Sequence, residues 1–385
     1  MKTVSHEGNL LIFHGSNFLK QRLILSILSG KSVNIVNIRS QDDAPGLRGY
    51  EVSLIRLFDK ISNGSEIDIN KSGTSILFKP GILNGGVIHH ECNLERGIGY
   101  YLDVLLALGP FCKIPINATL RGITNSKDCP SVDHIKSSAL PNLLKFLVVD
   151  EGLELKIKQR GMRPLGGGEI QFKCPVRKTL RSLQLAKPGM IKRIRGIAYT
   201  SKVSPALGNR AIEKAKGKLL EYIPDIYIYA DQSKGKAAGN SPGFGINLVA
   251  ETTEGVFYSA ENVSNDVSMG ETVTIPEDLG LMAACKLLEE IYRGGCVDST
   301  FQWLTVLYMA LGQKNISKFV TGPLSDYTIH FLQHLHEFFA ITFKLENPKP
   351  EDFGGVDEDD MLPGAKKVLL TCIGVGYTNM NKRTN

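Results

Sequence analysis

The sequence predicts an α/β fold of the α+β kind, with three repeats of a two-helix, four-stranded-sheet unit and a smaller inserted α/β domain. Three observations lead to this prediction. Six segments have the apolar spacing of amphipathic helices, and they fall into three pairs. One β-like run separates the members of each pair, and a hairpin-like double strand follows each pair. The same order of elements therefore occurs three times, which indicates an internal triplication.

The first copy begins with a predicted helix over residues 16–29 and has its second helix over 47–59. The run SVNIVNI lies between them and is rich in the β-branched residues that strands favour. The stretch SEIDINKSGTSILFKPG follows, with apolar runs on both sides of a Lys-Ser-Gly turn, and it predicts a hairpin.

The second copy has predicted helices over 97–108 and 132–147, with KIPINATL between them and the double strand LELKIKQRGMRPLGGGEIQFKCP after them. The third copy has helices over 299–311 and 326–339, separated by ISKFVTG. Its double strand, ITFKLE and KKVLLTCIGVGY, is joined by a loop whose residues 351–360 hold six acids and no base. We expect this loop to be solvated, and mimicry or screening of a polyanion is the alternative.

Residues 186–293 break this rhythm between the second and third copies. They contain about four strand-like runs and two predicted helices, at 205–220 and 276–292, so we interpret them as an inserted domain. The core of three repeats then comprises residues 1–185 and 294–385. The loop SKGKAAGNSPGFG in the insert lacks the first glycine of a Walker phosphate loop, and we expect it to be a flexible hinge or an RNA-facing loop.

Composition restricts the class of protein. Seven cysteines occur without a Cys-x-x-Cys pair, which favours reduced thiols and an intracellular location. No apolar run reaches the roughly 18 to 20 residues of a membrane span, and the first residues lack the apolar stretch of a signal peptide, so we expect no membrane partner.

The net charge of +6 is unevenly distributed. The segment Lys156–Arg195 contains twelve Lys or Arg and a single acid, Glu169. Strand alternation would project Lys156, Lys158 and Arg160 to one face, where they could follow RNA phosphates. The acidic surface of a partner protein, or solvent alone, is the alternative. The candidate contacts for RNA, another anion or a partner in this segment are Arg160, Arg163, Lys192, Arg193 and Arg195.

Three histidines occur within seven positions of the predicted helix 326–339. His330 and His334 stand one turn apart and could share a metal ion with Glu337. The stretch lacks the Glu of a His-Glu-x-x-His motif, and phenylalanine and leucine form an apolar stripe beside the histidines. We therefore favour a helix whose histidines flank its buried face, and we predict no metal site.

Three stretches resemble the RNA 3′-terminal phosphate cyclase family: NIRSQDDAPGLR at 37–48, RGMRPLGGGEI at 160–170 and IGVGYTNMNKR at 373–383. The resemblance covers almost the whole chain and implies the family's fold of three repeats with one inserted domain. It also implies the family's chemistry, in which ATP serves to close a 2′,3′-cyclic phosphate on RNA ends through a histidine that becomes linked to AMP.

Several residues of that chemistry are replaced in this chain. Phe13 stands where the family's glycine-rich stretch has a glutamate, and two of three glycines are missing. Asp42 replaces the second arginine of the pattern Asn-Ile-Arg-x-x-Arg, while Arg39 keeps the first, and Arg39 and Arg48 stay candidate anion contacts. Tyr327 stands in the place of the nucleophilic histidine, and a phenol with an ordinary pKa of about 10 is a poor substitute. We therefore expect no cyclase activity and no cofactor.

These replacements resemble the cyclase-like branch of the family found in eukaryotes. That resemblance implies a nucleolar ribosome assembly factor needed for early pre-rRNA cleavages and small-subunit rRNA maturation. It also implies binding to pre-rRNA and to a ribosome-assembly GTPase in the small-subunit processome.

Two other interpretations stay open. One is a pre-rRNA endonuclease with a rebuilt site, in which Asp326 or Tyr327 would move protons during attack by a 2′-hydroxyl. The other is an active cyclase with a displaced nucleophile such as His330. The candidate endonuclease residues are Ser325, Asp326, Tyr327, Lys318 and Arg39.

Overall fold

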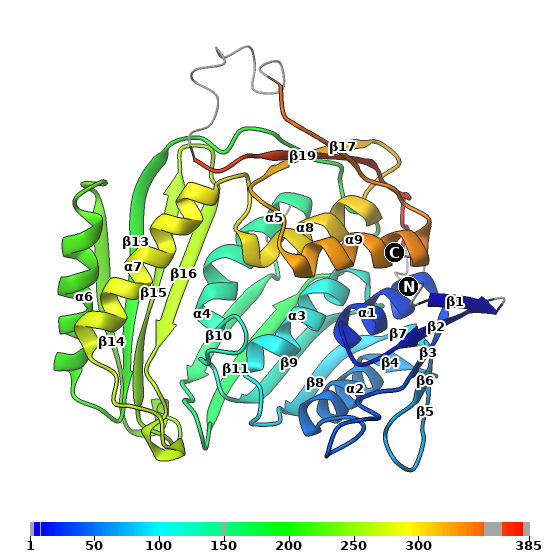
Figure 1. The fold of residues 1–385 in the computed structure, drawn as a ribbon, viewed down its shortest axis with the longest axis horizontal. Helices are drawn as coiled ribbons and strands as arrows, with labels where there is room; N and C mark the ends of the chain where they lie inside the picture. The colour runs from blue at the N-terminus through cyan, green and yellow to red at the C-terminus, as the bar shows by residue number, and fades with distance from the viewer. Residues whose placement is uncertain (1–3, 8, 148–150, 350–363, 380–385) are drawn as a thin grey trace.

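The structure is a computed structural model that describes residues 4–7, 9–147, 151–349 and 364–379 (Figure 1). It confirms the predicted α/β class: three mixed sheets surround a central group of helices, and a fourth mixed sheet carries two helices of its own. The predicted acidic loop at 351–360 lies outside the described residues.

The first sheet has the strand order β1-β2-β3-β6-β5. Its helices, α1 (Leu19–Ser29) and α2 (Gly49–Ile61), begin three and two residues later than the periodicity predicts. Two further short strands, β4 (Ser62–Asn63) and β7 (Ile82–Leu83), pair with each other. The strands of the sheet are β1 (Val4–Glu7), β2 (Leu10–His14), β3 (Ser32–Val36), β5 (Glu66–Ile69) and β6 (Ile76–Lys79).

The second sheet has the order β10-β11-β9-β8. Its first helix is α3 (Ile98–Leu108), and the predicted helix 132–147 consists of α4 (Val132–His134), a π-helix (Ile135–Ala139) and α5 (Leu140–Leu147). The π-helix precedes Pro141, which has no amide to donate to the carbonyl of Ser137, so the α-helical pattern is interrupted there. The strands are β8 (Gly85–Glu91), β9 (Ile114–Gly122), β10 (Glu154–Gln159) and β11 (Gly168–Cys174).

The third sheet has the order β12-β17-β19-β18. A 3-10 turn (Ser299–Phe301) leads into α8 (Gln302–Leu311), and α9 (Asp326–Phe339) follows after β17. The strands are β12 (Gln184–Leu185), β17 (Ile316–Thr321), β18 (Lys344–Glu346) and β19 (Val368–Ile373).

The three sheets share one pattern of strand pairing. Each sheet contains one parallel pair (β2 with β3, β8 with β9, β12 with β17), and in the first sheet β1 adds an antiparallel strand beside β2. The second strand of that pair then lies antiparallel to β6, β11 or β19, which in turn lies antiparallel to β5, β10 or β18. Three copies of one unit would produce this pattern, and the triplication itself stays a prediction.

The fourth sheet has the order β14-β13-β15-β16, and α6 (Pro205–Leu219) and α7 (Pro276–Arg293) pack on one of its faces (Figure 1). These elements fall within the predicted insert 186–293, whose boundaries stay a prediction. The strands are β13 (Ile191–Ser201), β14 (Ile226–Ser233), β15 (Gly243–Thr252) and β16 (Phe257–Val263).

The loop predicted to be a flexible hinge or an RNA-facing loop is bound to residues 160–166, which follow β10. The amide of Arg160 donates to the carbonyl of Ala237 (3.0 Å), and the amide of Gly239 donates to the carbonyl of Arg160 (2.7 Å). Asn240 donates to Gly166 in the same way (2.9 Å). A free hinge is therefore the wrong description, because the glycine-rich backbone approaches the segment 160–166 closely enough for direct pairing.

The close packing of α6 against α7 gives a testable prediction. A Cβ at Gly280 of α7 would lie 2.2 Å from the carbonyl oxygen of Ala211 in α6, so Gly280→Ala forces the helices apart. We expect this change to lower the free energy of unfolding by about 1–3 kcal/mol in denaturant titrations. The matched control is Gly217→Ala in α6, where nothing lies within 4 Å, and it should stabilise the protein by up to about 1 kcal/mol. Equal effects at the two positions would contradict the packing role.

Candidate functional site

A cavity of about 560 Å³ lies where α1, α2, α3, α8 and α9 meet. Five aromatic side chains dominate its lining, one from each helix or its N-cap, and we call it the aromatic pocket. They are Phe18, Tyr50, Tyr100, Trp303 and Tyr327.

A buried ion pair lies beside these rings. Lys20 of α1 donates to the carboxylate of Asp103 in α3, and the Lys20 ammonium lies 4.7 Å from the ring centroid of Tyr100. Burial alone would lower the pKa of Lys20, but the neighbouring Asp103 carboxylate outweighs it and raises the pKa above the ordinary lysine value. Lys20 is therefore charged and engaged within the protein.

Arg39 also lines the aromatic pocket, and it is engaged as well. Its two terminal nitrogens each lie 2.7 Å from an oxygen of Glu51, the bidentate geometry of a strong arginine–carboxylate pair. The amide of Arg48 donates to the same carboxylate (2.8 Å), and the Arg48 guanidinium lies 3.6 Å from Asp42. The aspartate that replaces the family's second arginine therefore faces an arginine of this chain.

The charges that line the aromatic pocket cancel. Three cationic side chains stand against three anionic ones, so the formal net charge of the lining is zero. A nucleoside triphosphate needs an excess of cations around its phosphates, and the pocket does not fit one. The charged lining residues are Lys20, Arg39, Arg96, Glu51, Asp103 and Asp128.

Phe13 lies in the core and not in the lining of the aromatic pocket. Its ring stacks on Phe338 of α9 with the centroids 5.9 Å apart, and the edge of the His334 ring lies 5.5 Å away. The guanidinium of Arg22 covers the ring at 4.7 Å. Phe13 thus helps to pack β2 against α9.

Tyr327 lies in the first turn of α9, and its ring meets Trp303 edge-on at 5.8 Å. Burial raises the pKa of Tyr327 above the ordinary tyrosine value. A phenol that ionises even less readily than usual does not replace imidazole as a nucleophile at neutral pH.

The candidate endonuclease residues are only partly brought together. Ser325, Tyr327 and Arg39 line the aromatic pocket, whereas Asp326 is exposed and, like Lys318 of β17, is outside that lining. Ser325 serves as the N-cap of α9, since its hydroxyl accepts from the amide of Thr328 (3.3 Å).

Two of the three histidines of α9, His330 and His334, pack against neighbouring residues, and His336 is exposed. The Nδ1–H of His334 donates to the side-chain oxygen of Gln21 (2.9 Å), and burial lowers the pKa of His334 to about 3. The ring of His330 lies against Phe18, with centroids 4.4 Å apart. Over the described ranges, no three His, Cys, Asp or Glu side chains gather in a way that could hold a metal ion.

Arg160 is buried, with 3% of its surface exposed, so the surface position predicted for it is wrong. Its guanidinium donates to Asp133 and Asn125, lies 3.1 Å from Asp231 and covers the ring of Tyr199 at 4.3 Å. The cause is a register shift in β10 between Ile157 and Gln159, which ends the alternation that the prediction assumed.

The other basic candidates are at least partly exposed. Arg193 and Arg195 project from β13 toward Glu251 (2.6 Å) and Asp225 (2.9 Å), and Lys192 beside them is exposed. Arg163 lies elsewhere, on the turn after β10, and pairs with Asp128. Half-exposed ion pairs contribute little, about 0–1 kcal/mol, so these arginines can exchange a carboxylate for a phosphate.

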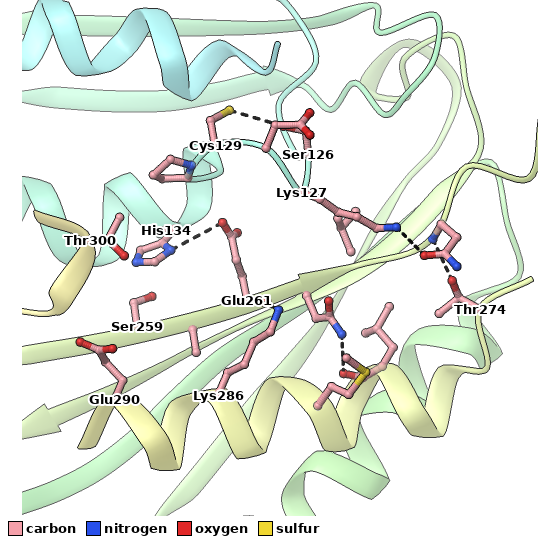
Figure 2. Close-up of a pocket in the computed structure, with 18 of the residues that line it drawn as sticks. Ser126, Lys127, Cys129, His134, Ser259, Glu261, Thr274, Lys286, Glu290 and Thr300 are labelled. Atoms are coloured by element: carbon pink, nitrogen blue, oxygen red, sulfur yellow. Dashed lines mark hydrogen bonds and ion pairs between the residues drawn. The ribbon is translucent and has the colours of Figure 1, made fainter. Parts of the chain in front are cut away.

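A second cavity, of about 900 Å³, was not predicted from the sequence (Figure 2). It runs along β16, between α7 and the loop 126–130, and we call it the β16 groove. Asp128, Cys129, Pro130 and Thr300 line both this groove and the aromatic pocket.

His134 of α4 lies at one side of the β16 groove and joins three parts of the chain (Figure 2). Its Nδ1 lies 3.5 Å from Glu261 of β16, and its Nε2 lies 3.3 Å from Asp298, the N-cap of the turn before α8. Burial opposes the charged form, but the two carboxylates outweigh burial and raise the pKa of His134 to about 10. With both nitrogens bound, His134 links the segments and is not a free base.

The three similarly paired sheets, the fourth sheet with its two helices and the aromatic pocket between the central helices define the class of α/β protein. The chain belongs to the RNA 3′-terminal phosphate cyclase family, since the sequence model with that description matches residues 11–345. No helix in the part of the chain that the structure describes is long and apolar enough to cross a membrane.

Curated relatives match over nearly their whole length. The chain is 63% identical to a "Probable RNA 3'-terminal phosphate cyclase-like protein" of Drosophila melanogaster, with 100% of both chains covered. It is 54% identical to an "RNA 3'-terminal phosphate cyclase-like protein" of Mus musculus, with 99% of each covered. It is 40% identical to the "rRNA processing protein rcl1" of Schizosaccharomyces pombe, with 98% of this chain and 99% of that protein covered.

The raised pKa of His134 predicts a pH-dependent contribution to stability. The stabilisation is complete below the ordinary histidine pKa of 6.5 and is lost as the pH rises through about 10, because the unfolded chain releases this proton first. Between pH 6 and 10, the difference in unfolding free energy between wild type and His134→Gln should start at about 3–5 kcal/mol and shrink steadily. The control His89→Gln, at an exposed position of β8, should change stability by less than about 0.5 kcal/mol. A His134→Gln difference that stays constant with pH would show that His134 is neutral.

The Lys20–Asp103 pair gives a second prediction. Lys20→Met leaves a buried carboxylate without its cation and should lower the free energy of unfolding by about 3–5 kcal/mol. The double variant Lys20→Met/Asp103→Leu removes both charges and should regain most of that loss in denaturant titrations. The single variant Asp103→Leu completes the cycle. If the losses in unfolding free energy of the two single variants add up to that of the double variant, Lys20 and Asp103 are not coupled.

Proposed function

We propose that this protein acts in rRNA processing as a ribosome assembly factor and carries out no cyclase chemistry. The fission yeast relative is named an rRNA processing protein, and the match covers nearly the whole length of both proteins. Both facts support a role of this chain in rRNA processing. The absence of cyclase chemistry is supported by the aromatic pocket, whose lining charges cancel. There Lys20 pairs with Asp103, and Arg39 pairs with Glu51.

In this proposal the protein works in the nucleolus, within the small-subunit processome, and is required for early pre-rRNA cleavages and maturation of the small-subunit rRNA. It binds pre-rRNA and a ribosome-assembly GTPase. The resemblance of the chain to the eukaryotic cyclase-like branch supports these roles.

The basic residues of β13 are the contacts we propose for RNA or for the GTPase. Lys192, Arg193 and Arg195 lie within four positions of one strand and are all at least partly exposed. The carboxylates of Glu251 and Asp225 hold the side chains of Arg193 and Arg195 in place. Because exposed ion pairs contribute little free energy, a phosphate can replace either carboxylate at little cost. Arg163 is a separate candidate, and Arg160 is no longer one.

We assign no RNA cleavage step to this chain. An endonuclease built around Tyr327 would need a group that moves protons at neutral pH, and burial raises the pKa of Tyr327. Asp326 is outside the lining of the aromatic pocket, and Glu51 occupies both terminal nitrogens of Arg39.

The test uses the triple variant Lys192→Gln/Arg193→Gln/Arg195→Gln. Removing three phosphate contacts should weaken binding to a pre-rRNA fragment and reduce the slope of log affinity against log salt by up to about 3. The measurement is fluorescence anisotropy over a range of salt concentrations, with binding to the GTPase measured in parallel.

The matched control removes three exposed cations from α6, as Arg210→Gln/Lys214→Gln/Lys216→Gln, and should leave the slope unchanged. Unaltered affinity and slope for both partners in the β13 variant would rule out this surface. A stable protein–AMP adduct after incubation of the wild type with labelled ATP would contradict the absence of cyclase chemistry.

A further inference from the structure

β16 is an edge strand of the fourth sheet, with β15 as its neighbour on one side. The amide of Ser264 donates to the carbonyl of Phe244 in the register of the β15–β16 pair (2.9 Å). Because antiparallel strands alternate between bonded and non-bonded pairs, the backbone of residues 260 and 262 faces β15. Ser259, Glu261 and Val263 therefore direct their amides and carbonyls away from the sheet.

The β16 groove runs along this outer edge, as Figure 2 shows, with α7 forming one wall. The Lys286 side chain reaches across from α7, and its ammonium donates to the outward-facing carbonyl of Glu261 (3.3 Å). Lysine is a residue that proteins use to protect edge strands from unwanted pairing. The backbone edge of β16 is thus accessible at Glu261 and Val263, which are partly exposed, whereas Ser259 is buried beside Ser137 of the π-helix. The carbonyl of Glu261 is covered by the exposed Lys286 side chain.

One side of the groove is apolar and exposed. Val273, Ile275 and Met282 line it with 76%, 55% and 54% of their surfaces exposed. Val267 and Met269 are exposed just beyond them, so five large apolar side chains lie open within sixteen residues. Exposed apolar residues gathered in this way mark a surface that binds another molecule.

The charge of the groove selects the kind of partner. Five acidic side chains line it against three Lys or Arg and the protonated His134, which leaves a net charge of about −1 in a chain whose net charge is +6. A polyanion such as RNA gains nothing here, whereas cationic side chains do. The acidic lining residues are Asp128, Glu261, Asp278, Glu289 and Glu290.

We propose that the β16 groove binds an extended segment of a partner protein, which adds to the fourth sheet as a fifth strand beside β16. Main-chain hydrogen bonds to Glu261 and Val263 supply affinity, as in other cases of strand addition. Alternate side chains of the segment are apolar, against Ile275 and Met282, and basic, near the acids of α7. This site is separate from the β13 surface and goes beyond the proposed function, since it requires no RNA.

The test uses labelled seven-residue peptides, the length of β16. A peptide of alternating lysine and valine should bind at least about tenfold more tightly than one of alternating glutamate and valine, because the groove is acidic. Two N-methylated forms of the lysine peptide distinguish strand pairing from charge attraction. One carries methyl groups on the amides that would face β16, and the other carries them on the alternate amides, which would face away. The form whose methyl groups face β16 should lose binding at least about tenfold, and the other form should keep it.

Hydrogen exchange gives an independent readout. The amides of Glu261 and Val263 should become protected when the lysine peptide is added, while those of residues 260 and 262 are already bonded to β15.

Variants at exposed positions locate the site. Met282→Ser and Asp278→Lys should each weaken peptide binding at least about fivefold. The matched controls Met190→Ser and Glu213→Lys change exposed residues of the same types elsewhere and should not affect it. The triple variant of β13 should bind the peptide as the wild type does, so failure here and failure of the proposed function can be told apart.

Four results would overturn the proposal. They are equal binding of the lysine and glutamate peptides, equal tolerance of both methylation patterns, no binding of either peptide at any concentration at which it stays monomeric, and binding of single-stranded RNA that Met282→Ser weakens.

Discussion

The buried guanidinium of Arg160 is the constraint on which the arrangement of the second sheet and the fourth sheet depends. A cation that is almost fully removed from water must have its charge compensated, and Asp133 and Asp231 do so from α4 and β14. The loop 235–240 then pairs with the backbone on both sides of Arg160. Because His134 follows Asp133 directly, the same helical turn also fixes Glu261 and Asp298, so one short segment determines how four parts of the chain meet.

The aromatic pocket shows how a cyclase-type cleft can be stable without a nucleotide. In a site that binds phosphates, unpaired cations repel each other until the ligand arrives. Here Asp103 and Glu51 neutralise Lys20 and Arg39, and aromatic rings supply apolar contact and cation–π interactions in addition. Phe13 also contributes to this internal stabilisation, because its buried ring stacks on Phe338 and is covered by the guanidinium of Arg22. The pocket is thus stabilised by contacts within the protein and needs no ligand to balance its charges.

The sequence predicted most helices because their apolar periodicity depends only on neighbouring residues. It missed the π-helix before Pro141, since a periodicity averaged over a window does not detect one inserted residue. It located Phe13 and Tyr327 by resemblance, but it placed Arg160 on the surface, because alternation along β10 fails at a register shift that depends on pairing with β11. Asp103 gave a signal that could have been used: it is the one charged residue of an otherwise apolar helix. The β16 groove could not be found this way, since its walls come from segments more than a hundred residues apart.

The wall between the two cavities is shared by both of them. Asp128, Cys129, Pro130 and Thr300 each face both chambers, so the partition is a single layer of residues. Any guest that pushes the partition from one chamber narrows or widens the other, and Arg163, held by Asp128, moves with it. The shapes of the two chambers are therefore tied to each other through these four shared residues.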